Sequence, residues 1–174
     1  MRAVFLTYLM LILIFLGCSS DMQWSTVERM IDLEYPDVEQ ISTDSLAVWL
    51  EEPDPPLLID ARSQEEYEVS HLQSAIRVDP DDPDLSALDE VPRDTPLVTY
   101  CSVGYRSSGI AATLMDEGFT NVSNLQGSIF HWANDGRPVY RDGLPVRQVH
   151  PYDRLWGQLL NEELRSTRPR PAGL

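Results

Sequence analysis

Two short, continuous apolar runs constrain the fold of this chain more than any other feature. Residues 57–61 read LLIDA and residues 96–100 read PLVTY. Short apolar runs of this kind are typical of strands buried on both faces of a parallel sheet. Further short strands are expected near 41–44, 75–78 and 121–125. The sequence therefore predicts several strands that share one sheet.

Helical patterns separate these strands. The clearest covers 107–118, where Ile110 and Leu114 are spaced for burial and Gly118 is a C-cap. Other helices are expected after an N-cap at Ser42 or Thr43, after a Ser63 cap over 64–69, and over 128–134 and 152–164. This alternation predicts an α/β fold, with one open, mostly parallel sheet and helices on both faces.

The charges of the chain exclude several functions. Its 174 residues carry a formal net charge of −15, so nucleic acid is a poor partner. All 13 basic residues are arginines, which rules out a Schiff-base lysine and a Walker-type phosphate lysine. His71, His131 and His150 lack the spacing of metal ligands. We therefore expect no metal and no cofactor.

The first residues resemble an export signal. Arg2 precedes an apolar run over 3–16, which is shorter than the ~20 residues that a membrane span needs. The run ends in Gly17-Cys18-Ser19-Ser20, which resembles the lipidation box of bacterial lipoproteins. We expect Cys18 to be lipidated and the domain to be tethered in the bacterial cell envelope, facing the periplasm. An uncleaved membrane anchor is the alternative.

Composition divides the chain into four parts. They are a signal peptide or anchor over 1–17, a polar tether over 18–40, a single domain over 41–140 and a C-terminal extension over 141–174. The tether has room for a short helix near 25–32. The extension is expected to carry one helix, over 152–164, and to be disordered over 168–174.

The loop 101–107, which reads CSVGYRS, carries the candidate chemistry. It follows a strand and precedes a helix, and ligands of open α/β sheets bind at the carboxyl ends of strands. Free amides and the helix dipole would lower the pKa of Cys101 and hold an anion beside it. Gly104 lets the loop bend, and Arg106 offers a planar fork to an oxyanion such as thiosulfate. A buried structural cysteine, or a disulfide with Cys18, is the alternative.

Three ordered motifs resemble those of the rhodanese-like sulfurtransferase family. The loop is similar to the family's C-x-x-G-x-R-S. Residues 58–76 resemble its D-x-R and G-H-I-x-G-A signature, and residues 118–128 resemble G-F-x-x-V-x-x-L-x-G-G. The positions that depart from the family, all in scaffold turns, are Ser70, Gln73, Ser74 and Ser128, where Gly, Pro, Gly and Gly are usual. The resemblance covers about residues 40–140.

The resemblance implies a sulfurtransferase. Cys101 would take sulfur from a donor such as thiosulfate and pass it, as a persulfide, to a thiol or cyanide acceptor. The residues implied to bind substrate are Ser102, Val103, Gly104, Tyr105, Arg106 and Ser107. Asp60 and Arg62 would brace the fold as an ion pair, with Asp60 as a catalytic acid the alternative.

Two other functions stay open for a domain of this kind. The first is a non-catalytic binding, sulfur-carrier or sensor module. The second is a phosphatase or arsenate reductase, because the family includes such members with five residues between the cysteine and the arginine. Only four residues separate Cys101 from Arg106, and the shorter loop favours sulfur.

Overall fold

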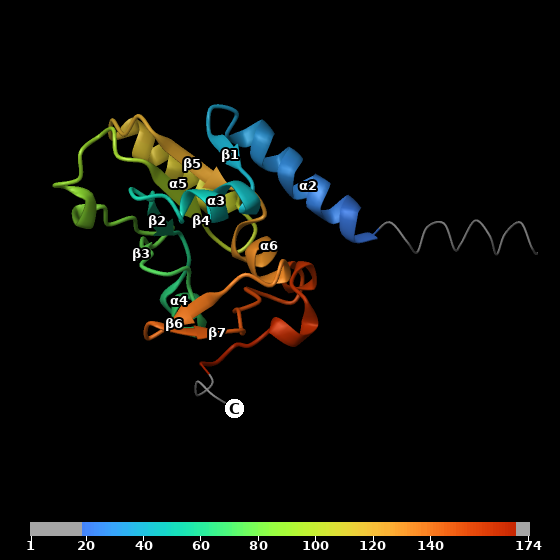
Figure 1. Cartoon of the computed structure of the whole chain (residues 1–174). Coiled ribbons are helices and arrows are strands. Elements are labelled where there is room, and N and C mark those ends of the chain that lie inside the picture. The colour runs from blue at the N-terminus through green and yellow to red at the C-terminus, as the bar shows by residue number, and fades with distance from the viewer. Residues whose placement is uncertain (1–18, 170–174) are drawn as a thin grey trace, which may run out of the picture.

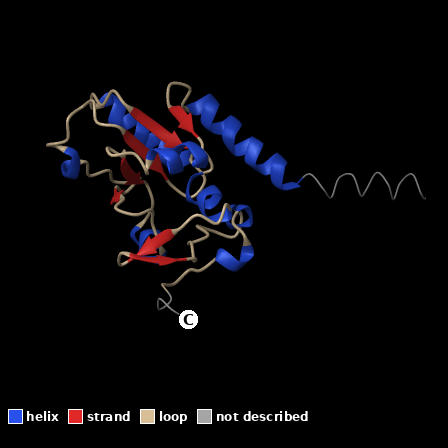
Figure 2. Ribbon diagram, in the orientation of Figure 1, coloured by secondary structure: helices blue, strands red, loops and turns tan. Residues whose placement is uncertain are grey.

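The computed structural model describes residues 19–169, and Figures 1 and 2 show how their elements are arranged. Five parallel strands form one sheet in the order β1-β5-β4-β2-β3, and β6 pairs with β7 in a separate antiparallel hairpin. The strands are β1 (Glu39–Ile41), β2 (Leu57–Asp60), β3 (Ile76–Arg77), β4 (Leu97–Tyr100), β5 (Val122–Leu125), β6 (Val139–Arg141) and β7 (Leu144–Val146). The helices are α2 (Ser19–Glu34), α3 (Thr43–Trp49), α4 (Gln64–Val69), α5 (Tyr105–Asp116) and α6 (Ser128–Asn134), with 3-10 turns η1 (Ser86–Leu88), η2 (Trp156–Leu159) and η3 (Glu162–Leu164).

Side chains of the central strands alternate between the two faces of the sheet, as strand geometry requires. In β2, Leu58 packs into a core cluster with Phe130 of α6, whereas its neighbour Ile59 packs with Leu114 of α5 in a second cluster. The two clusters lie on opposite sides of the sheet, which explains why successive residues of β2 and β4 are buried and mostly apolar. The predicted α/β fold, with helices on both faces, is confirmed.

The ends of two helices bear on the candidate site. Ser63 and Glu66 form a capping box at the start of α4. The helix expected over 107–118 begins two residues earlier, at Tyr105, because Gly104 takes the N-cap position with a φ of 111°. That left-handed conformation is open to glycine and strained for other residues, so the active loop turns into α5 at Gly104.

The segment expected to be a polar tether is largely helical. α2 covers Ser19–Glu34, well beyond the expected 25–32, and packs against α5. Val27 and Ile31 are each only 3% exposed, and burial of such side chains stabilises a fold by roughly 1.5–3 kcal/mol each. This helix is therefore part of the folded unit. Cys18 and the other residues of 1–18 lie outside the described residues. Within residues 19–169, every helix is too short or too polar to span a membrane.

The hairpin of β6 and β7 was not expected from the sequence. Its turn is formed by Asp142 and Gly143, whose φ values are 53° and 73°, as in the two-residue turns that suit the twist of a hairpin. Tyr140 ties the hairpin to the domain, because its backbone exchanges hydrogen bonds with that of His71 at 2.9 and 2.7 Å.

The prediction of a single helix over 152–164 is wrong, because the segment forms two separate 3-10 turns, η2 and η3. The side chain of Asn134 in α6 accounts for the break. It donates to the Leu159 carbonyl and accepts from the Asn161 amide, both at 2.8 Å. The tail thus docks its backbone on α6 instead of closing helical hydrogen bonds of its own. Residues 170–174, which include most of the expected disordered end, lie outside the described residues.

Candidate functional site

Cys101 lies directly after the carboxyl end of β4, and the start of α6 holds its backbone in place. The Cys101 amide donates to the Ser128 hydroxyl at 3.0 Å, and the Cys101 carbonyl accepts from the Ile129 amide at 3.2 Å. A third bond, from the Phe130 amide to the Ser102 carbonyl, measures 3.2 Å. The loop is therefore fixed on both sides of the sulfur, and Cys101 is only 1% exposed.

The surroundings of the Cys101 sulfur favour the thiolate. The Gly104 amide donates to Sγ at 3.2 Å. Burial raises the pKa of the thiol, but the positive charge of Arg106 and hydrogen bonds from Ser107 and Gly104 outweigh burial, so the pKa lies below its ordinary value. A depressed pKa increases the fraction of thiolate at neutral pH, and the thiolate is the nucleophilic form.

Arg106 does not present a free fork to an incoming oxyanion, which differs from the expectation. Its Nη1 donates to Oε2 of Glu66 and its Nη2 to Oε1, both at 2.8 Å. Nη2 also donates to the Ser102 hydroxyl at 3.1 Å. The Tyr152 ring covers the guanidinium, with its centroid 4.5 Å from Cζ. Arg106 therefore acts on Cys101 through its charge while its hydrogen bonds serve Glu66 and Ser102.

Glu66 is the residue of the site that sequence reasoning missed. Its carboxylate accepts from Arg106, from the Ser102 hydroxyl at 2.8 Å and from the Ser63 amide at 3.1 Å. Although burial raises the pKa of Glu66, the hydrogen bonds and charge of Arg106 and the charge of Arg62 lower it to about 2. The carboxylate is thus charged at neutral pH. The S-x-x-E pattern of Ser63 to Glu66 was the available signal, but it indicated only a helix cap.

Asp60 and Arg62 form the expected ion pair beneath the loop. Arg62 Nε donates to Oδ1 of Asp60 at 2.8 Å and Nη2 to Oδ2 at 2.6 Å, and both side chains are fully buried. Arg62 also donates to the Ser70 carbonyl at 2.7 Å, and the Tyr100 hydroxyl donates to Asp60 at 2.6 Å. Because every contact is internal, the pair braces β2 against β4, and the structure gives no support to Asp60 as a catalytic acid.

The remaining loop residues expected to bind substrate mostly face inward. Val103 is buried in a core cluster, and Tyr105 packs edge-on against Tyr35 with ring centroids 5.7 Å apart. Ser107 is fully buried and donates to Asn124 at 2.6 Å. These side chains shape the loop rather than point out of it. A ligand of this loop would therefore contact its backbone, the Cys101 sulfur and the edge of the site formed by Arg106.

The three histidines are dispersed in the structure as in the sequence. The His71 ring stacks on the Tyr67 ring with centroids 3.9 Å apart. The His131 and Trp24 rings also pack together, with centroids 3.8 Å apart. His150 accepts a hydrogen bond from the Tyr152 amide at 3.1 Å. Across residues 19–169, no group of three or more His, Cys, Asp or Glu side chains is placed to hold a metal ion.

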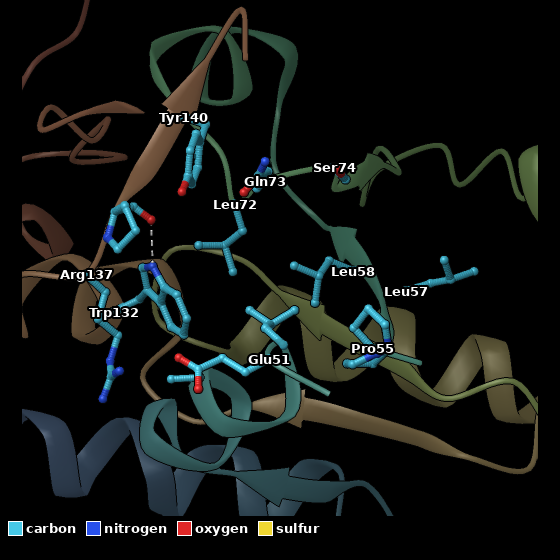
Figure 3. Close-up of a pocket in the computed structure, with 14 residues that line it drawn as sticks. Glu51, Pro55, Leu57, Leu58, Leu72, Gln73, Ser74, Trp132, Arg137 and Tyr140 are labelled. Atoms are coloured by element: carbon cyan, nitrogen blue, oxygen red, sulfur yellow. Dashed lines mark hydrogen bonds between the residues drawn. The ribbon is translucent and has the colours of Figure 1, made fainter. Parts of the chain in front are cut away.

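A cavity of about 560 Å³ lies apart from this loop. Figure 3 shows Leu58, Leu72, Trp132 and Tyr140 around it, and Leu57 at the start of β2 also lines it. Cys101 follows the opposite, carboxyl end of the neighbouring strand. The cavity and the sulfur thus belong to opposite ends of the parallel strands, and the cavity is not the reaction site.

Comparison with known proteins agrees with the geometry of the loop. Residues 42–135, over half of the chain, match the rhodanese-like domain family. The tRNA uridine(34) hydroxylase of Photorhabdus laumondii is 31% identical over 134 residues, which cover 72% of this chain and 37% of that protein. The Escherichia coli protein of the same name is 28% identical over 134 residues, which again cover 72% of this chain and 37% of that protein. The chain spans little more than a third of the length of these relatives.

Solved structures show the same fold. A protein from Bacillus halodurans has a TM-score of 0.56 at 19% identity, covering 71% of this chain and 88% of its own. A thiosulfate sulfurtransferase from Pseudomonas aeruginosa has a TM-score of 0.52 at 26% identity, covering 60% of this chain and 20% of its own. With the family match over 42–135 and a cysteine loop at the end of the fourth strand, this chain belongs to the rhodanese-like domain family.

Proposed function

We propose that this protein transfers sulfane sulfur through a persulfide on Cys101. The thiolate attacks the outer sulfur of a donor, the sulfur–sulfur bond of the donor breaks, and the remainder leaves; with thiosulfate the leaving group is sulfite. A thiolate or cyanide acceptor then attacks the bound sulfur and regenerates the Cys101 thiolate. The observation that carries the proposal is the Gly104 amide 3.2 Å from Sγ, in a loop that lowers the pKa of the thiol.

Burial of the sulfur favours this chemistry over transfer of a phosphoryl group. Cys101 is 1% exposed, and a single terminal sulfur atom needs far less room than a tetrahedral phosphate or arsenate. The four-residue spacing to Arg106 is short for a tetrahedral oxyanion, and Glu66 already occupies the guanidinium. Phosphatase or arsenate reductase activity is therefore a weaker hypothesis than sulfur transfer.

The named activity of the curated relatives does not transfer readily to this chain. They are tRNA hydroxylases, whereas a net charge of −15 repels a polyanion such as tRNA. Small sulfur compounds and thiols are accordingly the partners that we propose, with no nucleic acid among them.

Mass spectrometry of the purified protein tests the proposal. After incubation with an excess of a sulfane donor, the peptide that contains Cys101 should gain one sulfur atom, and cyanide should remove that atom as thiocyanate. The variant Cys101→Ser is the control, because the hydroxyl has nearly the same size and cannot form a persulfide. Sulfur gained equally by the serine variant would end the proposal.

A sulfur-carrier or sensor module is the second candidate, and the burial of Cys101 favours it, since a shielded persulfide is held rather than released. The two functions differ in turnover. An enzyme produces many equivalents of thiocyanate per protein, whereas a carrier loads one sulfur and stops until a specific partner collects it.

We further propose that Cys18 is lipidated and tethers the domain to the bacterial cell envelope. The support is the apolar run over 3–16 followed by Gly17-Cys18-Ser19-Ser20, and two or more acyl chains suffice for stable attachment. Fractionation of cells that express the wild type and Cys18→Ser tests this location. Wild-type protein in the soluble cytoplasm would contradict it, and equal retention of both proteins on the membrane without lipid would favour an uncleaved anchor.

A further inference from the structure

The cavity at the start of β2 has the size and the lining of a small-molecule site. Its volume is about 560 Å³, and sites for drug-sized ligands span roughly 300–1,000 Å³. The buried side chains of Leu58, Leu72 and Trp132 form an apolar floor. Figure 3 shows these side chains and the ring of Tyr140 around one common space. The apolar body of a ligand would be shielded from water there.

A carboxylate on the rim of this cavity is not used by the fold. Glu51 lies just beyond the end of α3, lines the cavity and is exposed. Among the described residues, its side chain takes part in no hydrogen bond or ion pair. Figure 3 shows the carboxylate on the Trp132 side of the cavity. The rim therefore presents a negative charge that a ligand could neutralise.

The basic residue on the rim, Arg137, already has its counter-charges. Its Nη2 donates to Oδ1 of Asp44, and its Nε lies 3.8 Å from Oδ2 of Asp135. Its Cζ also lies 5.2 Å from the centroid of the Trp132 ring. Two carboxylates thus share one guanidinium, and Glu51 adds a third negative charge. The surplus attracts a cation to the cavity and repels an anion.

We propose that this cavity binds a small organic cation, namely an amine with an apolar or aromatic body, and that Glu51 is the partner of its charge. An ammonium group carries only hydrogen-bond donors. The rim supplies acceptors for them in the Glu51 carboxylate, the Gln73 amide oxygen and the Tyr140 hydroxyl. Aromatic faces such as those of Trp132 and Tyr140 also attract cations. The site is separate from Cys101 and does not depend on the proposed transfer of sulfur.

Isothermal titration calorimetry of the full chain, with three matched probes, tests the proposal. The probes are 4-phenylbutylamine, 4-phenylbutanol and 4-phenylbutyrate, which share one apolar body and are a cation, a neutral molecule and an anion at neutral pH. Glu51→Gln removes the proposed partner. Glu52→Gln is the matched control, because it removes the same charge from an exposed neighbour that does not line the cavity. Ala47→Leu places a larger side chain in the cavity from a half-buried position of α3.

We expect the wild type to bind the amine most tightly, the alcohol less tightly and the carboxylate least. The amine should exceed the alcohol in affinity by at least about threefold, the size expected of one ion pair at a partly exposed site. Glu51→Gln should reduce this ratio to within about 1.5-fold of unity, and Glu52→Gln should retain it. Ala47→Leu should weaken the binding of the amine and of the alcohol. Cys101→Ser should bind the amine as the wild type does, because the sulfur lies at the other end of the strands.

Several results would overturn the inference. They are the absence of binding by the wild type at millimolar probe, equal affinities for the amine and the alcohol, and equal losses in the two glutamate variants. Tightest binding of the carboxylate would show that Arg137 attracts the ligand instead. Unchanged binding by Ala47→Leu would place the probe outside the cavity. A peptide of residues 165–174, which carries three arginines, is the last probe. If it binds more tightly than the amine and displaces it, the occupant is a cationic protein segment and the assignment to a small amine is wrong.

Discussion

Replacing Glu66 with glutamine should lower the free energy of unfolding by about 3 kcal/mol at neutral pH. Glu66 is buried, yet the bonds and charge of Arg106 and the charge of Arg62 lower its pKa from an ordinary 4.5 to about 2. Each unit of depression is worth about 1.4 kcal/mol of stability in the charged form, so the shift corresponds to roughly 3 kcal/mol. Glutamine keeps the size of the side chain and removes the charge.

The sign of the pH dependence follows from the direction of that shift. Because the pKa of Glu66 is lower in the folded protein than in the unfolded chain, its contribution is fully present above pH 4.5 and is lost as the pH falls towards 2. The wild type should therefore lose about 3 kcal/mol more than Glu66→Gln over that window. Other carboxylates titrate in both proteins and cancel in the difference.

Urea unfolding followed by circular dichroism, at several pH values between 7 and 2, measures this difference. The control is Glu68→Gln, because Glu68 is exposed and its contact is a hydrogen bond from Gln64 at 2.9 Å; its stability should stay within about 0.5 kcal/mol of the wild type. Curves for Glu66→Gln and wild type that run parallel down to pH 2 would refute the reasoning. A loss in Glu68→Gln as large as in Glu66→Gln would do so as well.

Other substitutions test the neighbouring contacts. Cys101→Ser should abolish sulfur transfer while its melting temperature stays close to that of the wild type. Arg106→Gln should raise the pKa of Cys101, since it removes the charge that favours the thiolate; the pH profile of iodoacetamide alkylation should shift to higher pH, and an unshifted profile would contradict that role. Ser74→Gly should stabilise the fold by up to about 1 kcal/mol because Ser74 has a φ of 61°. Ser128→Gly should destabilise it despite a φ of 50°, because the bond to the Cys101 amide is lost; thermal melts that rank these two variants the other way would show that strain outweighs the bond.

Local patterns predicted the parts of the fold whose causes are local. The apolar runs that became β2 and β4 are buried on both faces, so their composition identified them without knowledge of their partners. The same holds for Cys101, because a cysteine between a buried strand and a helix lies at the carboxyl edge of the sheet in any parallel arrangement. Position along the chain was sufficient for these predictions.

The role of Glu66 could not be found in the same way. Its partner Arg106 lies 40 residues away along the chain, and the local S-x-x-E pattern already accounts for a glutamate at this position. One carboxylate serves both purposes, since Oε2 accepts from the Ser63 amide and from Arg106. Nothing in the sequence indicates that a helix cap also neutralises the arginine of a loop elsewhere.

The missed hairpin has a different cause. Asp142-Gly143 is a recognised hairpin signal, but each flanking strand has only three residues. Pro138 directly precedes the first strand and Pro145 lies within the second. Strands so short carry little alternation of their own. The hairpin exists because Tyr140 pairs with His71 and because Arg141 donates to the Val69 carbonyl at 3.2 Å, contacts made across the fold.

Ser128 shows how a departure in the scaffold reaches the chemistry. It stands where glycine is usual in the family and keeps the left-handed backbone that glycine would adopt, with a φ of 50°. The strain is offset by its hydroxyl, which accepts from the Cys101 amide at 3.0 Å and donates to the Leu125 carbonyl at 3.1 Å. The side chain thus joins the end of β5 to the backbone of the nucleophile. The charge of Arg106 and hydrogen bonds from Ser107 and Gly104 stabilise the thiolate, so a turn that looked purely structural helps to fix the loop that carries the reacting atom.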